Sequence, residues 1–256
     1  MAQSTNNDKK FLWAHRCLSC SPLLLSLLLL TCGALEGNRE RVAKAPRALI
    51  TQRTEQGIDS AVAVAGKIDG YMKLESFIGP TQTKEPILQE INSDDGPEGT
   101  SGKPYIRLWY CDAHGARQGF GDFEGPAIPS ANPVAKQDDH ISPNEIHLAS
   151  GHTGYQLVFF NICGSAQNAS LWKSALGGSD GQPGYLCWET SWTPGLSYGV
   201  GLRFGEGAVE YFKQLYGPDR SDKSAGRYVY DYIKDYYRKT RGDELVGTLE
   251  ASLKLL

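Results

Sequence analysis

The chain has no strong excess of charge of either sign, and this limits the partners that it can bind. Its 256 residues include 26 basic and 29 acidic side chains, for a net charge of −3. Proteins that coat nucleic acid are strongly basic, so we expect no nucleic-acid partner. The charged fraction is 21% and the hydrophobic fraction 40%, a balance that excludes wholesale disorder. A chain of this length predicts one domain, or one domain with an appendage.

Short motifs of phosphate and zinc sites are also missing. No GxxxxGK[ST] occurs, and the glycines between positions 199 and 207 lie within a helical pattern, so we predict no phosphate-binding loop. The residues that resemble a metal cluster are His140, His147, His152, Asp138 and Asp139. Because neither HExxH nor a suitably spaced CxxC pair supports them, we predict neither a metal nor a cofactor.

Few cysteines are left for a disulfide framework. Of the six in the chain, Cys17, Cys20 and Cys32 lie within the first 35 residues. The remaining three are Cys111, Cys163 and Cys187. An odd number cannot all pair with one another, so we expect at least one free thiol among these three.

A long uncharged run is present near the N-terminus. Residues 17–35 carry no charge, positions 23–30 read LLLSLLLL, and Lys9, Lys10 and Arg16 precede the run. This order is typical of a secretory signal, with small residues ending at Ala34 as a cleavage site. An uncleaved anchor is the alternative, because 19 uncharged residues can just span a bilayer. We therefore predict an exported or membrane-anchored protein rather than a cytoplasmic one, with 1–35 as signal peptide or anchor and 36–46 as linker.

From residue 47 onward, strand-like and helix-like segments alternate. Apolar segments predict strands at 48–51, 72–78, 105–111, 156–162 and 185–190. Helical spacing and helix-start signals predict helices at 57–71, 83–92, 143–149, 195–216 and 226–238. Strands joined by helical crossovers indicate an α/β fold with a mostly parallel sheet and helices on both faces. The predicted domain spans residues 47–240, and residues 241–256 are left as a C-terminal tail.

The segment 119–139 carries Gly, Pro and Asn without a clear period. A stretch of this length inside a compact domain is usually functional or without a fixed conformation. Little of it can form a core, so we predict that it is mobile or packed only at its edges.

Two reactive side chains directly follow the third and fourth predicted strands. His114-Gly115 follows the third strand, and Cys163-Gly164 ends the fourth. Since sites in parallel sheets form at the carboxyl ends of strands, we expect the two strands to be neighbours there. A thiol beside an imidazole predicts covalent catalysis with Cys163 as the nucleophile and His114 as the base. The N–H groups of Gly115 and Cys163 would then form an oxyanion hole.

His-Gly after one strand and Cys-x-Ser after the next resembles the caspase-like cysteine peptidases, which include caspases, metacaspases, legumains, gingipains and CHAT domains. His114 precedes Cys163 by 49 positions, close to the caspase spacing of about 50. Residues 112–120 look like the legumain-type His-Gly-Ala loop, and residues 161–165 look like the Cys-containing loop. The resemblance implies a caspase-like fold and a cysteine endopeptidase with a His/Cys dyad, acting on peptide or protein substrates through a thioester.

The resemblance also implies a substrate pocket walled by the loop after the fifth predicted strand. Here this loop contains Trp188, Glu189 and Trp192. The tryptophans would clamp a substrate side chain, and Glu189 would select a basic residue by charge pairing. Asp112 is a further candidate for the pocket wall. The alternative is that both tryptophans are core residues and that Glu189 is solvated.

Two other functions remain open from the sequence. One is a catalytically inactive caspase-like adaptor or binding domain, although the intact pair of His114 and Cys163 favours activity. The other is an unrelated flavodoxin-like binding protein. A fold that keeps His114 and Cys163 out of reach of each other would indicate the latter.

Overall fold

The structure is a computed structural model that describes eight stretches of the chain: residues 47–53, 58–92, 106–117, 123–131, 140–150, 152–190, 194–215 and 222–256. The predicted signal or anchor and its linker lie outside these stretches. All the described residues belong to one compact unit, Val42–Leu256. Within the described stretches, no helix is both long and apolar enough to cross a membrane.

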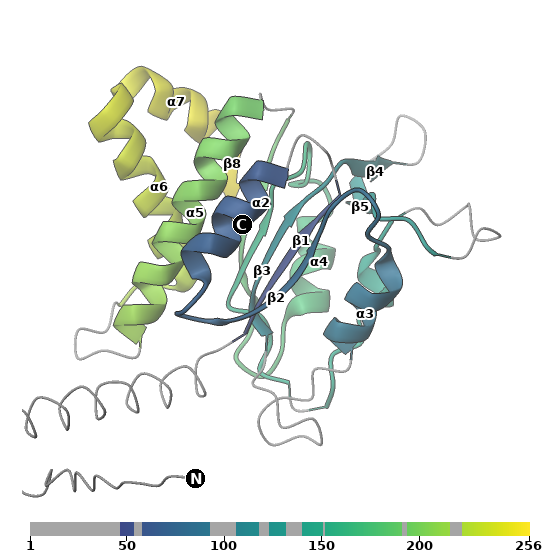
Figure 1. Ribbon diagram of the computed structural model, residues 1–256. Helices are drawn as coiled ribbons and strands as arrows, with labels where there is room; N and C mark the ends of the chain where they lie inside the picture. Colours follow the sequence, from purple (N-terminus) through teal and green to yellow (C-terminus); the bar gives the residue numbers. More distant parts are fainter. Residues whose placement is uncertain are drawn as a thin grey trace, which may run out of the picture. The chain divides into compact units, whose positions relative to one another are not determined.

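A six-stranded sheet forms the centre of this unit (Figure 1). Its strands lie in the order β2 (Lys73–Ile78), β1 (Arg47–Gln52), β3 (Ile106–Asp112), β6 (Leu157–Phe160), β7 (Gly184–Trp188) and β8 (Leu253–Leu255). Neighbouring strands from β2 to β7 are parallel, whereas β8 is antiparallel to β7. A separate antiparallel hairpin of β4 (Gly115–Arg117) and β5 (Phe123–Pro126) follows β3.

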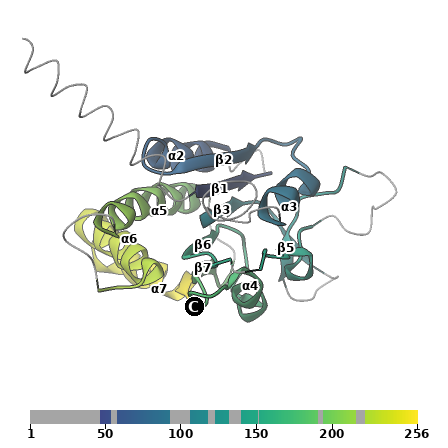
Figure 2. The same ribbon diagram turned by 90° about the horizontal axis from the view of Figure 1, so that it is seen from below.

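Helices cover both faces of this sheet (Figure 2). One face carries α2 (Ile58–Ile68), α5 (Pro194–Leu215), α6 (Ala225–Arg241) and α7 (Asp243–Ser252). The other face carries α3 (Lys84–Asn92) and α4 (Ala169–Leu176). The predicted fold class is confirmed: the domain is α/β, its sheet is mostly parallel, and its architecture is consistent with a caspase-like fold.

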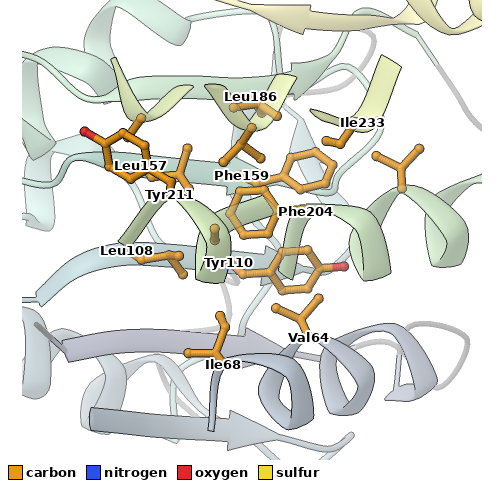
Figure 3. Close-up of a cluster of buried hydrophobic side chains, with 14 of the residues drawn as sticks. Val64, Ile68, Leu108, Tyr110, Leu157, Phe159, Leu186, Phe204, Tyr211 and Ile233 are labelled. Atoms are coloured by element: carbon orange, nitrogen blue, oxygen red, sulfur yellow. The ribbon is translucent and has the colours of Figure 1, made fainter. Parts of the chain in front are cut away.

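Alternating side chains along the central strands fill two separate cores. Tyr110 of β3 and Phe159 of β6 face the core beneath α2, α5 and α6, where Phe159 packs on Phe204 with ring centroids 5.2 Å apart (Figure 3). Trp109 and Phe160 face the opposite core, with ring centroids 5.0 Å apart. Because both faces are covered, β3 and β6 read as nearly continuous apolar runs. These two strands therefore give the residues after them a rigid base.

The helix predicted over 143–149 is wrong beyond its first turn. A 3₁₀ helix, η1 (Pro143–Glu145), begins after Ser142 as predicted, and the Ser142 N–H donates to the Glu145 carboxylate at 2.9 Å. The Asn92 side chain then forms hydrogen bonds with backbone groups that would bond within the helix if it continued. It donates to the Glu145 carbonyl at 2.9 Å and accepts from the His147 N–H at 2.7 Å. These contacts end the helix after one turn.

The prediction of a C-terminal tail at 241–256 is also wrong. Helix α7 and strand β8 belong to the domain, and Val246, Leu249 and Leu253 are buried in its core. Strand β8 extends the sheet beside β7, where Leu253 lies opposite Trp188. A ten-residue helix that contains Gly247 and a strand of three residues give too little periodicity to be recognised from sequence.

The segment 119–139 is firmly packed in its described central part, residues 123–131, contrary to the prediction. Phe123 and Ile128 are fully buried. Gly125 lies so close to the Ile141 carbonyl that a side chain at 125 has no room. A few well-spaced apolar residues and one glycine thus hold a segment that lacks any regular period. Residues 119–122 and 132–139 lie outside the described stretches.

Candidate active site

The two predicted catalytic residues follow neighbouring strands. Strands β3 and β6 pair in parallel, with Cys111 opposite Phe160, and the Asn161 N–H extends the pairing by donating to the Cys111 carbonyl at 2.8 Å. His114 and Cys163 therefore leave their strands at the same edge of the sheet. This confirms the prediction that the two strands lie side by side and parallel. Ligand sites in such sheets form at this edge.

The backbone at Gly115 packs directly against the loop that carries Cys163, residues 161–168, which we call the Cys163 loop. A Cβ atom at Gly115 would lie 3.3 Å from the Cys163 carbonyl oxygen, 3.4 Å from Ile162 Cγ2 and 3.0 Å from Phe123 Cδ2. Glycine permits this close approach because it has no side chain. The segments bearing the candidate base and nucleophile are thus in contact through their backbones.

Exposure separates Cys163 from the other described cysteines. Cys111, Cys163 and Cys187 form no disulfide, and only Cys163 among them is partly exposed. Burial raises the pKa of the Cys111 and Cys187 thiols well above their usual range. Since the thiolate is the reactive form, these two thiols are inert. His114 is exposed at the same edge of the sheet, so both members of the candidate dyad are at least partly exposed to solvent.

A buried serine anchors the Cys163 loop to the sheet. The Ser165 hydroxyl donates to the Phe160 carbonyl at 2.9 Å and accepts from the Trp188 N–H at 3.1 Å. The Ser165 carbonyl accepts from the Tyr185 hydroxyl at 3.2 Å. Gly164 has φ 69°, a left-handed conformation that favours glycine. The Gly-Ser pair after Cys163 therefore fixes the turn that presents the thiol.

A polar network is buried directly behind the candidate dyad. Asp112 lies two positions before His114, and Asn161 lies two positions before Cys163. Asn161 Nδ2 donates to Asp112 Oδ2 at 2.8 Å, and Asn161 Oδ1 accepts from Trp188 Nε1 at 2.7 Å. An indole N–H can only donate, so the contact with Trp188 fixes which way the amide points. The network joins the ends of β3, β6 and β7.

Tyr110, Ser60 and Ser197 complete this network, which we call the Asn161 network. Asn161 Nδ2 lies 2.8 Å from the Tyr110 hydroxyl and 2.6 Å from Ser197 Oγ, and Tyr110 is hydrogen-bonded to Ser60. The Tyr110 hydroxyl donates to Asp112 at 3.2 Å. Burial, reinforced by the Asp112 carboxylate, raises the pKa of Tyr110, so the phenol stays neutral and remains a donor. Through Ser60 and Ser197 the network also ties α2 and α5 to the strands.

The predicted pocket residues lie in different environments. Asp112 and Trp188 are buried within the Asn161 network, so in this structure they belong to the core and offer no surface to a substrate. The Glu189 side chain is exposed after the end of β7, and its N–H donates to the Ser252 carbonyl at 2.8 Å. Trp192 lies outside the described residues. Selection of a basic substrate residue by Glu189 stays a prediction.

Asn161 and the hydroxyl of Ser165 belong to the motif around Cys163, but the sequence predicts no function for either of them. A signal was present for Asn161. Asn161 is an amide directly after the apolar run of β6, two positions beyond Phe159 and on the same face. A polar side chain at such a position must find partners, and these are the residues that support the Cys163 loop.

The structure separates the histidines that resembled a metal cluster in the sequence. His140 Nε2 lies 3.7 Å from the Glu124 carboxylate, whereas His152 is buried and its Nδ1 accepts from the Gly154 N–H at 2.7 Å. No cluster of three or more His, Cys, Asp or Glu side chains among the described residues could hold a metal ion. Asp138 and Asp139 lie outside those residues.

Comparison with known proteins does not assign a family. No protein-family model matches the chain, and no curated protein matches it. The likeness to caspase-like peptidases therefore depends on the residues at this edge of the sheet and on the architecture that places them there.

Proposed function

We propose that the protein is a caspase-like cysteine endopeptidase in which Cys163 is the nucleophile and His114 the general base. The observation that supports this most directly is the parallel pairing of β3 and β6, with Gly115 packed on the Cys163 backbone. It brings a partly exposed thiol and an exposed imidazole to one edge of the sheet. Both groups are of the kind that covalent peptide hydrolysis requires.

The reaction proceeds through a thioester. The Cys163 sulfur attacks the carbonyl carbon of the scissile bond while its proton passes to the His114 imidazole. The oxyanion that forms is stabilised by the N–H groups of Gly115 and Cys163. His114 then gives the proton to the leaving nitrogen, and the C–N bond breaks. Water, deprotonated by His114, attacks the thioester carbon, which releases the carboxylic acid and restores the thiol.

The position of Glu189 supports a preference for substrates with a basic residue. The carbonyls on either side of Glu189 bind the Cys163 loop: the Trp188 carbonyl accepts from the Ala166 N–H at 3.1 Å, and the Thr190 carbonyl accepts from the Gly164 N–H at 3.4 Å. Glu189 therefore follows β7 beside the loop that carries the nucleophile, with its carboxylate exposed. A carboxylate at such a position pairs well with Arg or Lys.

The decisive experiment measures cleavage of peptides that carry a basic, acidic or apolar residue before the scissile bond. We expect the protein to cleave after Arg or Lys. Cys163→Ala abolishes turnover and His114→Ala lowers it about 10²–10⁴-fold, the usual contribution of a general base. Glu189→Gln lowers kcat/KM for basic substrates about tenfold and leaves the others unchanged. Cys187→Ala, which removes a buried thiol, serves as the matched control and keeps the activity.

The inactive adaptor is the outcome that would replace this proposal. If no peptide is cleaved and Cys163 does not react with peptidyl electrophiles, the domain is a binding module. Full activity in Cys163→Ala would refute the assignment of the nucleophile. Cleavage only after acidic residues would leave the dyad but remove the role of Glu189.

We also propose that residues 1–35 direct export or anchor the protein to a membrane, since they carry the uncharged run. Fractionation of cells that express the full chain, compared with a chain starting at Glu36, tests this. Export or membrane association should require residues 1–35, and the N-terminus of the product shows whether they are cleaved. Equal soluble cytoplasmic amounts of both chains would contradict the proposal.

A further inference from the structure

Two neighbouring side chains of the Cys163 loop bind a single residue of the β4–β5 hairpin. Gln167 Oε1 accepts from the Phe123 N–H at 2.9 Å, and Asn168 Nδ2 donates to the Phe123 carbonyl at 2.9 Å. Both backbone polar groups of Phe123 are thus bound by amides of that loop. The hairpin ladder is irregular next to this residue, with a register shift between Ala116 and Arg117. The side-chain amides of Gln167 and Asn168 therefore stabilise the hairpin at the point where its own strand pairing is irregular.

Phe123 in turn determines where the residues after β3 lie. Its side chain is fully buried, and Phe123 Cδ2 is 3.0 Å from the position that a Cβ of Gly115 would take. Further along the hairpin, the Ala127 N–H donates to the His114 carbonyl at 2.8 Å. A continuous set of contacts therefore runs from the loop bearing the nucleophile, through Phe123, to the backbone of the candidate base.

The Asn168 side chain binds the Phe123 carbonyl instead of capping its own helix. Asn168 is the N-cap residue of α4, yet its side chain makes no capping hydrogen bond to the helix. An asparagine at this position ordinarily binds the free N–H groups of its own helix. Its φ of 59° is the only positive φ of a non-glycine residue among those described. Asparagine adopts this conformation more readily than most other side chains, but only glycine adopts it without a steric cost.

We infer that Gln167 and Asn168 are positioning residues that hold the hairpin, and with it His114 and Gly115, in place against Cys163. This inference rests on the proposed function. Without the two amides, Phe123 is free to shift relative to the Cys163 loop. A displacement of about 1 Å at a reacting group lowers a rate about 10²-fold.

The Asn168→Gly variant distinguishes an effect on the position of the reacting groups from an effect on the stability of the fold. Glycine takes the left-handed conformation without strain, so we expect the melting temperature to be unchanged or higher. The amide contact with Phe123 is lost, so kcat should fall about 10–100-fold with little change in KM. Gln167→Met removes the other contact at similar volume. Gln214→Met is the matched control, because Gln214 makes a comparable side-chain hydrogen bond to Tyr228, near the end of α5.

A second readout does not depend on peptide cleavage. The rate at which iodoacetamide alkylates Cys163 is measured against pH in the full-length protein, with the modified peptide identified by mass spectrometry. In the wild type, part of this profile should depend on His114 and disappear in His114→Ala. Asn168→Gly and Gln167→Met should shift the profile toward that of His114→Ala, whereas Gln214→Met should leave it unchanged.

The possible failures can be told apart. Wild-type alkylation profiles and wild-type kcat in both Asn168→Gly and Gln167→Met would overturn the positioning role and leave the dyad intact. Identical profiles for the wild type and His114→Ala would instead overturn the dyad itself, and the positioning role with it. A fall in melting temperature without a change of profile would show that the two amides are purely structural.

Discussion

Asn161 is a fully buried amide that binds side chains from three other elements of the domain. It contacts Asp112 at the end of β3, Trp188 at the end of β7 and Ser197 in α5. A buried polar group lowers stability unless its hydrogen bonds are made, and here both ends of the amide are bound. The stability of the sheet edge that carries Cys163 therefore depends on this one side chain.

Asn161→Ala should be strongly destabilising. The substitution removes the acceptor of the Trp188 N–H and a donor to the buried Asp112 carboxylate, which together are worth about 3 kcal/mol or more in free energy of unfolding. Urea denaturation measures the loss. Asn92→Ala is the comparison, because Asn92 also makes two hydrogen bonds but is only partly buried, and it should cost about 1 kcal/mol. Equal losses for both variants would contradict the importance of burial at Asn161.

The buried thiols make stability fall at alkaline pH. Burial raises the folded-state pKa of Cys111 and Cys187, whereas a thiol in the unfolded chain titrates near 8.5. Below about pH 8.5 the thiols stay protonated in both states, so their contribution is fully present. Above it only the unfolded chain loses protons, and the free energy of unfolding falls by up to about 1.4 kcal/mol per pH unit for each thiol.

Urea denaturation between about pH 8.5 and 9.5 checks this slope. The double variant Cys111→Ala with Cys187→Ala should show a flatter dependence on pH than the wild type. Val158→Ala also removes buried volume, from β6 between these cysteines, so it should lower stability at every pH while the slope persists. A slope that survives in the double variant would show that other groups cause it.

The reactive residues of the site could be predicted from sequence, but their supporting residues could not. His114 and Cys163 combine a reactive side chain with a position after an apolar strand, and both properties can be read along the chain. The roles of Ser165, Gln167 and Asn168 depend on partners 20 to 45 positions away, such as Tyr185 and Phe123. Common polar residue types reveal such roles only when the fold brings their partners together.

At the scale of elements, the stability of the β4–β5 hairpin depends on the close approach of Gly125 to the Ile141 backbone. Gly125→Ala should lower the free energy of unfolding by about 1–3 kcal/mol or more, because its Cβ would overlap the Ile141 carbonyl. Gly66→Ala is the matched substitution, in α2, where a Cβ meets no atom within 4 Å. It should raise stability by about 0.5–1 kcal/mol. Thermal and urea unfolding of the two variants measure the loss of stability in Gly125→Ala and the gain in Gly66→Ala. Equal effects in both variants would contradict the close packing at Gly125.

The main strands were predictable because their signal is local. The strand expected at 105–111 is found at Ile106–Asp112, and that expected at 72–78 is found at Lys73–Ile78. The unassigned elements lack such a signal. Strands β4 and β5 have three and four residues and contain Gly or Pro, and α4 has only eight residues. Contacts with distant parts of the chain stabilise these elements, and such contacts leave no period in the sequence.

At the scale of the whole domain, the C-terminal elements close one side of the sheet. Strand β8 pairs with β7, and beyond it Leu256 and Tyr185 exchange backbone hydrogen bonds of 3.0 and 3.3 Å. Helix α7 places Val246 and Leu249 in the core beside these strands. All six strands of the described sheet thus belong to the unit Val42–Leu256.

A chain of residues 42–256 should fold with the same melting temperature as the domain in the full-length protein. A chain of residues 42–241 should be insoluble or melt at least 10 °C lower, because it leaves the edge of β7 unpaired and removes three buried apolar side chains. Leu249→Ala should cost about 2–5 kcal/mol, whereas the exposed Leu171→Ala should change stability by less than about 0.5 kcal/mol. Equal melting of the two truncated chains would mean that α7 and β8 are dispensable.

The placement of the tryptophans gives the domain an intrinsic fluorescent reporter. Trp109 and Trp172 are buried in one core, whereas Trp188 is buried in the other with its indole N–H bound to Asn161. Indole emission responds to hydrogen bonding and local polarity, so an adduct on Cys163 that strains this contact should alter the emission of Trp188 without any added dye. The other tryptophans, which include Trp13 and Trp192 outside the described residues, are retained in Trp188→Phe, and this variant should abolish the change. The formation of an adduct on Cys163 can then be followed over time by the intrinsic fluorescence of Trp188.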